Sequence, residues 1–110
     1  MPTRSKIGEK PYSGPSYTAI RVRPADPATG SNVKIIAIGE NNRAGYHTYL
    51  RMDPEPGFIP KVSFVNLPPQ SETEEVLTPF SVDFGLKILD SMKTVVVVDT
   101  LGAHQVAVSE

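Results

Sequence analysis

The sequence contains no cysteine, and this absence excludes several classes of site at once. Disulfides, thiolate zinc sites, iron–sulfur clusters and cysteine nucleophiles all need a thiol. No apolar stretch approaches the length of about 18 residues that a membrane-spanning helix needs, so we expect no membrane partner. Residues 1–6 are basic, but no apolar core follows them, so we expect no secretory signal.

Motifs that assemble a catalytic or metal site are also missing. The sequence has no G-x-S-x-G, no P-loop and no G-x-G-x-x-G. Its two histidines, His47 and His104, are far apart and form no metal-ligand spacing, so we interpret both as structural. Carboxylates cluster only in residues 72–75, where helix capping would explain them. We therefore expect no enzyme, no cofactor and no metal.

The charges that are present are unevenly distributed along a chain of 110 residues, which is the size of one domain. Residues 1–66 contain nine Lys or Arg and five Asp or Glu, whereas residues 67–110 contain two and seven. Such a division has two interpretations. Either the charges are simply solvated and their distribution has no function, or one face of the protein is directed toward a polyanion. The apolar fraction of 39% predicts a lean core, which favours a dimer.

The first two-thirds of the chain predict an arm followed by a sheet. Residues 1–15 are rich in proline and glycine and are expected to form an extended N-terminal arm, and residues 16–110 form the domain proper. Residues 40–44 are expected to form a hairpin loop. The sheet is predicted as an antiparallel meander over about 16–67, with β-forming stretches at residues 16–23, 32–39, 45–52 and 58–67.

Residues 71–101 allow two interpretations. Ser71 and Glu74 have the spacing of a capping box, which favours a helix that begins there. Apolar residues then recur at helical spacing, but residues 80–88 also alternate as a strand would. We favour a helical region over about 71–101, and a strand remains open over residues 79–101. The fold class predicted in this way is α+β, with two C-terminal helices after the sheet.

The stretch 45–52 separates two faces by its alternation. Leu50 and its even-numbered neighbours fall on one face, and His47, Tyr49 and Arg51 on the other. A sheet face with cations, hydroxyls and aromatic rings is suited to RNA, because cations contact phosphates and rings stack on bases. An ordinary solvated face remains the alternative. The candidate RNA-binding residues are Lys34, His47, Tyr49, Arg51, Lys61 and Ser63.

The order of these pieces resembles the coat proteins of the single-stranded RNA bacteriophages, the levivirus-like group. The matching pieces are residues 42–52, 61–67, 71–75, 88–89 and 95–101, and the resemblance covers about residues 32–101.

That resemblance implies an intertwined dimer in which two sheets join edge to edge and the helices lie across the partner. It implies that the dimers close into an icosahedral virus shell, assembled in the bacterial host cytoplasm. It also implies that the inner sheet face binds genomic RNA, including a hairpin. The protein would then be a capsid protein of the virion.

Two other classes stay open. One is a small all-β structural or adaptor module of a tailed phage without RNA binding, in which residues 80–101 form a hairpin around Asp90–Lys93. The other is a single-strand binder on a small barrel, with the same aromatic and basic face. A circular dichroism spectrum separates them from the coat interpretation, because only a coat protein needs helices.

Overall fold

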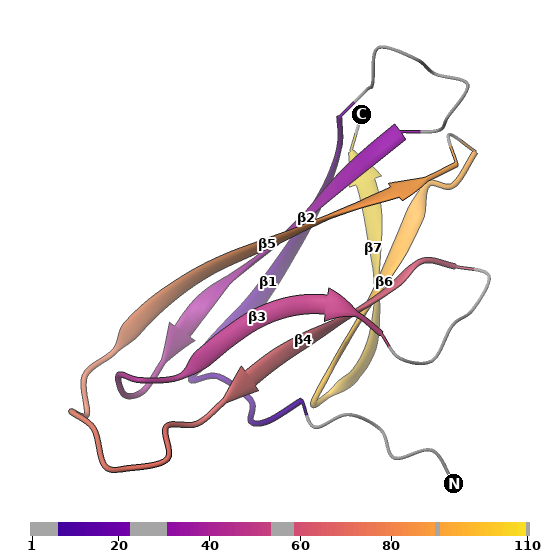
Figure 1. Cartoon of the computed structure of the whole chain (residues 1–110). Coiled ribbons are helices and arrows are strands. Elements are labelled where there is room, and N and C mark those ends of the chain that lie inside the picture. The colour runs from indigo at the N-terminus through magenta and orange to yellow at the C-terminus, as the bar shows by residue number, and fades with distance from the viewer. Residues whose placement is uncertain (1–6, 23–30, 54–58, 90, 110) are drawn as a thin grey trace, which may run out of the picture.

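All regular structure that the computed structural model describes is β-strand (Figure 1). The structure describes residues 7–22, 31–53, 59–89 and 91–109. The seven strands are β1 (Ser13–Val22), β2 (Ser31–Asn41), β3 (His47–Met52), β4 (Lys61–Leu67), β5 (Thr78–Ile88), β6 (Thr94–Asp99) and β7 (Gly102–Ser109).

The strands form one mixed sheet in the order β3-β4-β6-β7-β1-β2-β5. Neighbours pair antiparallel except at β1–β7 and β4–β6, which are parallel. The sheet curls until its two edge strands, β3 and β5, run side by side in the same direction (Figure 1). No strand pairing among the described residues joins them, so the sheet is a nearly closed barrel with a seam between β3 and β5.

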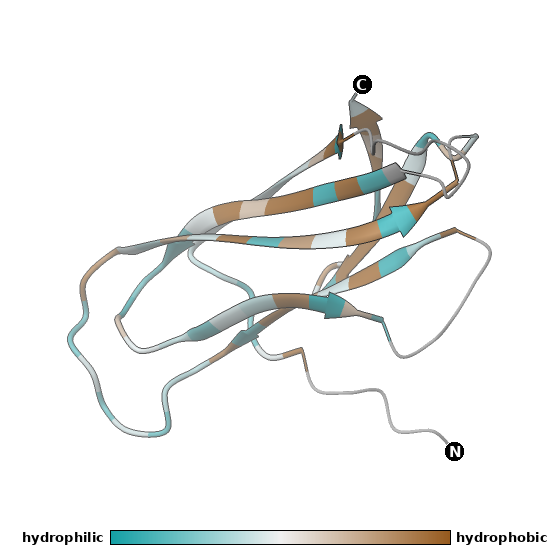
Figure 2. Cartoon of the chain, turned by 45° about the horizontal axis from the view of Figure 1, so that its top comes forward, coloured by the Kyte–Doolittle hydropathy of each residue, from teal (hydrophilic) through white to brown (hydrophobic). Residues whose placement is uncertain are grey.

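The core lies inside this barrel and is built by alternation. Every second residue of β2 points inward, as do the matching residues of its partners, and Figure 2 shows the resulting alternation of apolar and polar positions along the long strands. Phe64 packs between Tyr17 and Phe80, at ring-centroid distances of 6.2 and 5.5 Å. The buried apolar cluster comprises Ala19, Val33, Ile35, Ala37, Leu50, Val62, Phe64, Ile88, Val95 and Val97.

The parallel pair β4–β6 is buried on both of its faces. Residues 62–66 and 95–99 are all buried, although they alternate between the inside and the outside of the barrel. This pattern explains why neither strand alternates regularly between apolar and polar residues. It also explains why the run of four valines at 95–98 is a strand.

The prediction of an α+β fold with two C-terminal helices was wrong. The described residues contain no helix, and β5 follows the alternation of residues 80–88 instead of their helical spacing. Pro79 and Gly85 would weaken a helix, but β5 is an edge strand and tolerates both. The Ser71–Glu74 segment is a loop, in which the Thr73 hydroxyl donates to the Ala44 carbonyl at 2.6 Å.

The predicted meander was wrong as well. β2 pairs with β1 and β5 and not with β3, so residues 40–44 connect two different parts of the barrel. The alternative hairpin at residues 80–101 does not form either, because β5 pairs with β2 whereas β6 pairs with β4 and β7. Asp90, at the centre of that proposed hairpin, lies outside the described residues. The strands predicted at residues 16–23, 32–39, 45–52 and 58–67 agree with β1 to β4.

Part of the predicted N-terminal arm lies against the barrel. Gly8 bridges Asn66 at the end of β4, where the amide of Glu9 donates to the Asn66 carbonyl at 2.9 Å. Residues 13–15 belong to β1, and residues 1–6 lie outside the described residues. The helices that a levivirus-like coat protein lays across its partner are absent from the described residues. The fold therefore gives that resemblance no support.

Candidate nucleic-acid interface

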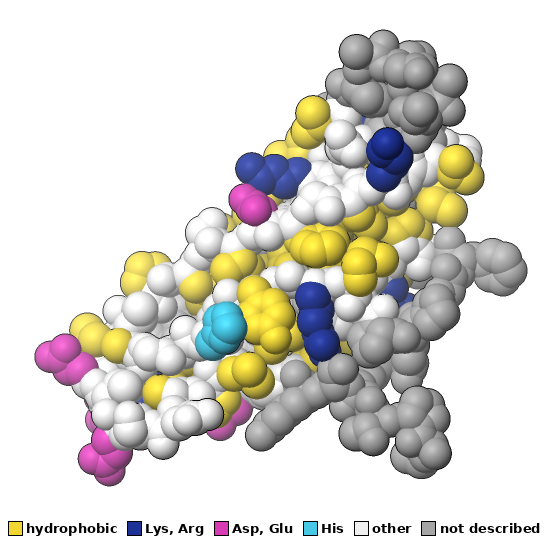
Figure 3. Space-filling view, in the orientation of Figure 1, with side chains coloured by type: hydrophobic (Ala, Val, Ile, Leu, Met, Phe, Trp, Pro, Cys, Tyr) yellow, Lys and Arg dark blue, Asp and Glu magenta, His cyan; other side chains and the backbone are white. Residues whose placement is uncertain are grey.

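The outer face of β3 presents two rings and a guanidinium in one row. His47 is exposed, Tyr49 and Arg51 are half-buried, and Leu50 between them points into the core. The His47 and Tyr49 rings lie 4.7 Å apart between centroids with a tilt of 45°. Figure 3 shows a histidine, a hydrophobic side chain and a basic side chain side by side on this face. The predicted alternation of β3 is therefore present, with these three side chains outward.

Arg51 is the unusual member of the row. Its Nε and Nη2 atoms are enclosed and have no hydrogen-bond partner. A guanidinium has five N–H donors, and leaving enclosed donors unpaired costs free energy. Arginine is also the side chain that best fits a phosphate or carboxylate through two parallel hydrogen bonds. Both atoms are closed off from the surface, so a ligand would meet the positive charge of the half-buried guanidinium, and the two enclosed N–H groups would stay out of its reach.

The second strand of this face is β4. Register places Arg51 opposite Ser63, and Lys61 lies two residues before Ser63 on the same outer side. Lys61 is half-buried, and no ion pair is found for it among the described residues. Ser63 is buried, with 1% exposed, and its hydroxyl donates to Asp53 Oδ2 at 2.8 Å. Lys61 is thus available to a ligand, whereas Ser63 is occupied inside the protein.

Lys34 lies apart from this row. It is on the outer face of β2, which β5 separates from the seam. Its Nζ forms an ion pair with Asp83 Oδ2 at 3.4 Å across the β2–β5 ladder. The structure therefore brings His47, Tyr49, Arg51 and Lys61 together and leaves Lys34 elsewhere.

A hollow adjoins His47 in the structure, and no pattern in the sequence indicates it. It has a volume of about 420 Å³ and lies where the start of β3 meets the start of β5. Arg43 and Tyr46 line it, and the Tyr46 hydroxyl donates to Glu9 Oε1 at 2.8 Å. Partial burial first, and this hydrogen bond second, raise the pKa of Tyr46. The only signal in the sequence was an arginine just before a strand, which is too common to identify a site.

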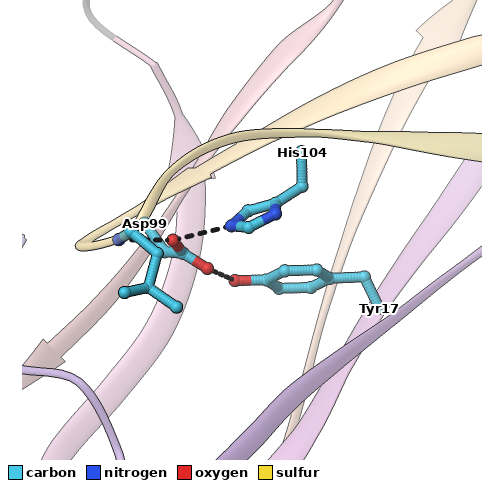
Figure 4. Close-up of polar contacts among 4 residues, drawn as sticks. Tyr17, Asp99 and His104 are labelled. Atoms are coloured by element: carbon cyan, nitrogen blue, oxygen red, sulfur yellow. Dashed lines mark hydrogen bonds and ion pairs between the residues drawn. The ribbon is translucent and has the colours of Figure 1, made fainter.

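A second polar cluster surrounds Asp99 (Figure 4). Asp99 of β6 accepts a hydrogen bond from the Tyr17 hydroxyl at 2.5 Å and lies 2.9 Å from His104 Nε2. The Leu101 amide donates to the same carboxylate at 2.8 Å. These contacts use both carboxylate oxygens and connect β1, β6 and β7. The cluster therefore holds strands together, and it explains the position of His104.

Neither a metal centre nor a membrane span is found in the part of the chain that the structure describes. No group of three or more His, Cys, Asp or Glu residues there could hold a metal ion. No helix there is long and apolar enough to cross a membrane.

No family model, curated protein or solved structure matches this chain. The class defined by the geometry is therefore a small, nearly closed β-barrel with an aromatic and basic outer face.

Proposed function

We propose that this protein binds single-stranded nucleic acid on the outer face of β3, beside Lys61 at the start of β4. The observation that carries this proposal is the row of side chains on β3, in which the paired rings of His47 and Tyr49 lie in line with the half-buried guanidinium of Arg51. Arg51 and Lys61 would contact phosphates, and the two rings would stack on unpaired bases. The other functions that the coat resemblance implies, a shell and a place in the virion, are left out because they rest on the missing helices.

The face favours single strands over duplexes for a physical reason. A ring can stack only on a base whose own face is free, which duplex bases do not offer. Recognition by stacking and by phosphate contacts is also tolerant of sequence, because every base has an aromatic face. We therefore expect similar affinity for different sequences of equal length and weak binding to duplexes.

The test measures fluorescence anisotropy of a labelled single-stranded oligonucleotide, as RNA and as DNA, in a salt titration. Arg51→Ala and Lys61→Ala should each weaken binding and reduce the salt slope by about 0.7, because each removes one phosphate-neutralising charge. Tyr49→Ala should cost about 1–3 kcal/mol of binding free energy and leave the slope unchanged. Circular dichroism should show that each variant is folded.

Lys34→Ala is the matched control. It also removes one lysine from an outer strand face, but this lysine is engaged with Asp83 and lies beyond β5. We expect wild-type affinity for it. The proposal fails if the wild-type protein binds neither oligonucleotide, or if Arg51→Ala, Lys61→Ala and Tyr49→Ala combined bind as tightly as wild type.

A further inference from the structure

We propose that an acidic tip of one copy of this chain docks on the β3–β4 face of a second copy. The tip is the loop of residues 70–77 between β4 and β5, and the β3–β4 face is the surface around Arg51 and Lys61 described above. This inference does not rest on the proposed function, because its test contains no nucleic acid. A docked tip and a nucleic acid would exclude one another from the same cations.

The tip carries three carboxylates and no cation. Glu72, Glu74 and Glu75 are all exposed, and no ion pair is found for them among the described residues. Val76 and Leu77 follow at once and are also exposed, at 49% and 50%. The tip therefore presents an apolar pair directly beside its charges.

The tip is held in place by the rest of the barrel. The Thr73 hydroxyl donates to the Ala44 carbonyl at 2.6 Å, and the Ala44 amide donates to the Glu74 carbonyl at 3.1 Å. The Val76 amide donates to the same carbonyl at 3.0 Å. A segment fixed in this way loses little conformational entropy when it binds, which favours its use as a docking element.

The receiving face matches the tip in charge and in apolar surface. The half-buried guanidinium of Arg51 supplies one positive charge, and Lys61 adds a second. Ile59, which precedes β4, is 43% exposed. Carboxylates of the tip would meet the two cations, and its apolar pair would cover exposed apolar surface there. Charge complementarity of this kind sets the orientation of two partners.

The two surfaces lie apart on one molecule, so a single chain does not satisfy both. Figure 3 shows acidic side chains at the lower left end, where Figure 1 draws the β4–β5 loop, away from the basic side chain in the middle of the face. An interface between different surfaces of identical chains is heterologous and continues from copy to copy. We therefore expect chains or rings of copies in which each tip docks on the next β3–β4 face.

The experiment is sedimentation velocity of the full chain at rising concentration, with two charge-reversed variants. Arg51→Glu reverses a charge on the receiving face and leaves the tip unchanged. The second variant reverses the three charges of the tip and leaves the receiving face unchanged; it combines Glu72→Lys, Glu74→Lys and Glu75→Lys. The wild-type mass should rise with concentration and return to that of the monomer at high salt. Each variant alone should associate about tenfold more weakly or not at all.

The decisive sample is an equal mixture of the two variants. The intact tip of the first variant fits the intact face of the second, and the reversed tip and reversed face are again opposite in charge, so the mixture should regain assembly. Lys34→Glu makes the same charge change as Arg51→Glu away from this face, and it should assemble like wild type. Lys61→Glu repeats the test of the receiving face if Arg51→Glu does not fold by circular dichroism.

Several results would overturn the inference. A wild-type protein that remains monomeric at all concentrations would do so, and so would a mixture of folded variants that remains monomeric. Assembly of both variants alone, with wild-type strength, would instead point to the exposed apolar residues Ile20, Val22 and Ile38 and would equally reject the tip.

Discussion

Asp99 shows at the scale of a single residue how a buried charge is placed in this barrel. Only 4% of its side chain is exposed, yet it accepts hydrogen bonds from the Tyr17 hydroxyl and the Leu101 amide and faces the His104 ring. Such bonds to a charged acceptor offset the cost of removing it from water. Residues 17 and 99 are 82 positions apart, so no local pattern in the sequence would join them.

Tyr17 makes this cluster sensitive to alkaline pH. Burial first, and the hydrogen bond to Asp99 second, raise the pKa of Tyr17. Near pH 10 the tyrosine of the unfolded chain ionises while the folded protein keeps its phenol protonated. The unfolded state then binds fewer protons, so the free energy of unfolding falls as pH rises above about 10. Below that pH the contribution is fully present.

We expect Tyr17→Phe to flatten this alkaline loss of stability, since phenylalanine has no proton to release. At neutral pH the variant should be less stable by about 1–3 kcal/mol, because Asp99 loses a donor. Urea unfolding from about pH 8 to about pH 11 measures both effects. Tyr12→Phe, which removes an exposed tyrosine, should retain the wild-type decline. Parallel curves for wild type and Tyr17→Phe would contradict the assignment.

At the scale of elements, the sequence predicted the features that depend on local alternation of residues. It did not predict the features that depend on which strands pair with one another. The first four strands and the outward row of β3 follow from alternation within about eight residues. The Ser71–Glu74 capping signal is equally local, but pairing of β5 with β2 over eleven residues outweighs it. Pairing also determines that Ser63 is occupied by Asp53 and Lys34 by Asp83. No spacing within the sequence reveals these contacts.

Two side chains on the inward side of β3 lead to a prediction about stability. Leu50 is 6% exposed and lies in the core, whereas Met52, two residues later at the end of the strand, is 53% exposed. Leu50→Ala should lower the free energy of unfolding by about 2–5 kcal/mol, because it leaves a cavity. Met52→Ala truncates a side chain of similar size in the same strand and should change stability by about 0.5 kcal/mol or less. Urea unfolding measures both variants, and equal losses would mean that Leu50 is packed no better than Met52.

At the scale of the whole molecule, the barrel depends on joining the two ends of its chain. β7, the last strand, lies in the middle of the sheet between β6 and β1. Its partner β1 is the first strand, and Ala19 lies opposite Val108 in a parallel pairing. A parallel pair of this kind needs a crossover, here formed by most of the chain. No periodicity in the sequence indicates such an order, which is why a meander was the simpler prediction.

This closure predicts that a short truncation at one end will unfold the entire domain. Removing residues 106–110 deletes the inward-facing Val106 and Val108 and exposes an edge of both β1 and β6. Because β7 joins the two halves of the sheet, their contacts should be lost together, and urea unfolding should no longer be cooperative. The control is the full chain with Gln105→Ala and Ala107→Ser, two outward substitutions that keep β7 and should unfold like wild type. Cooperative unfolding of the truncated chain at the wild-type midpoint would show that β1 and β6 hold together without this strand, and that β7 does not close the barrel.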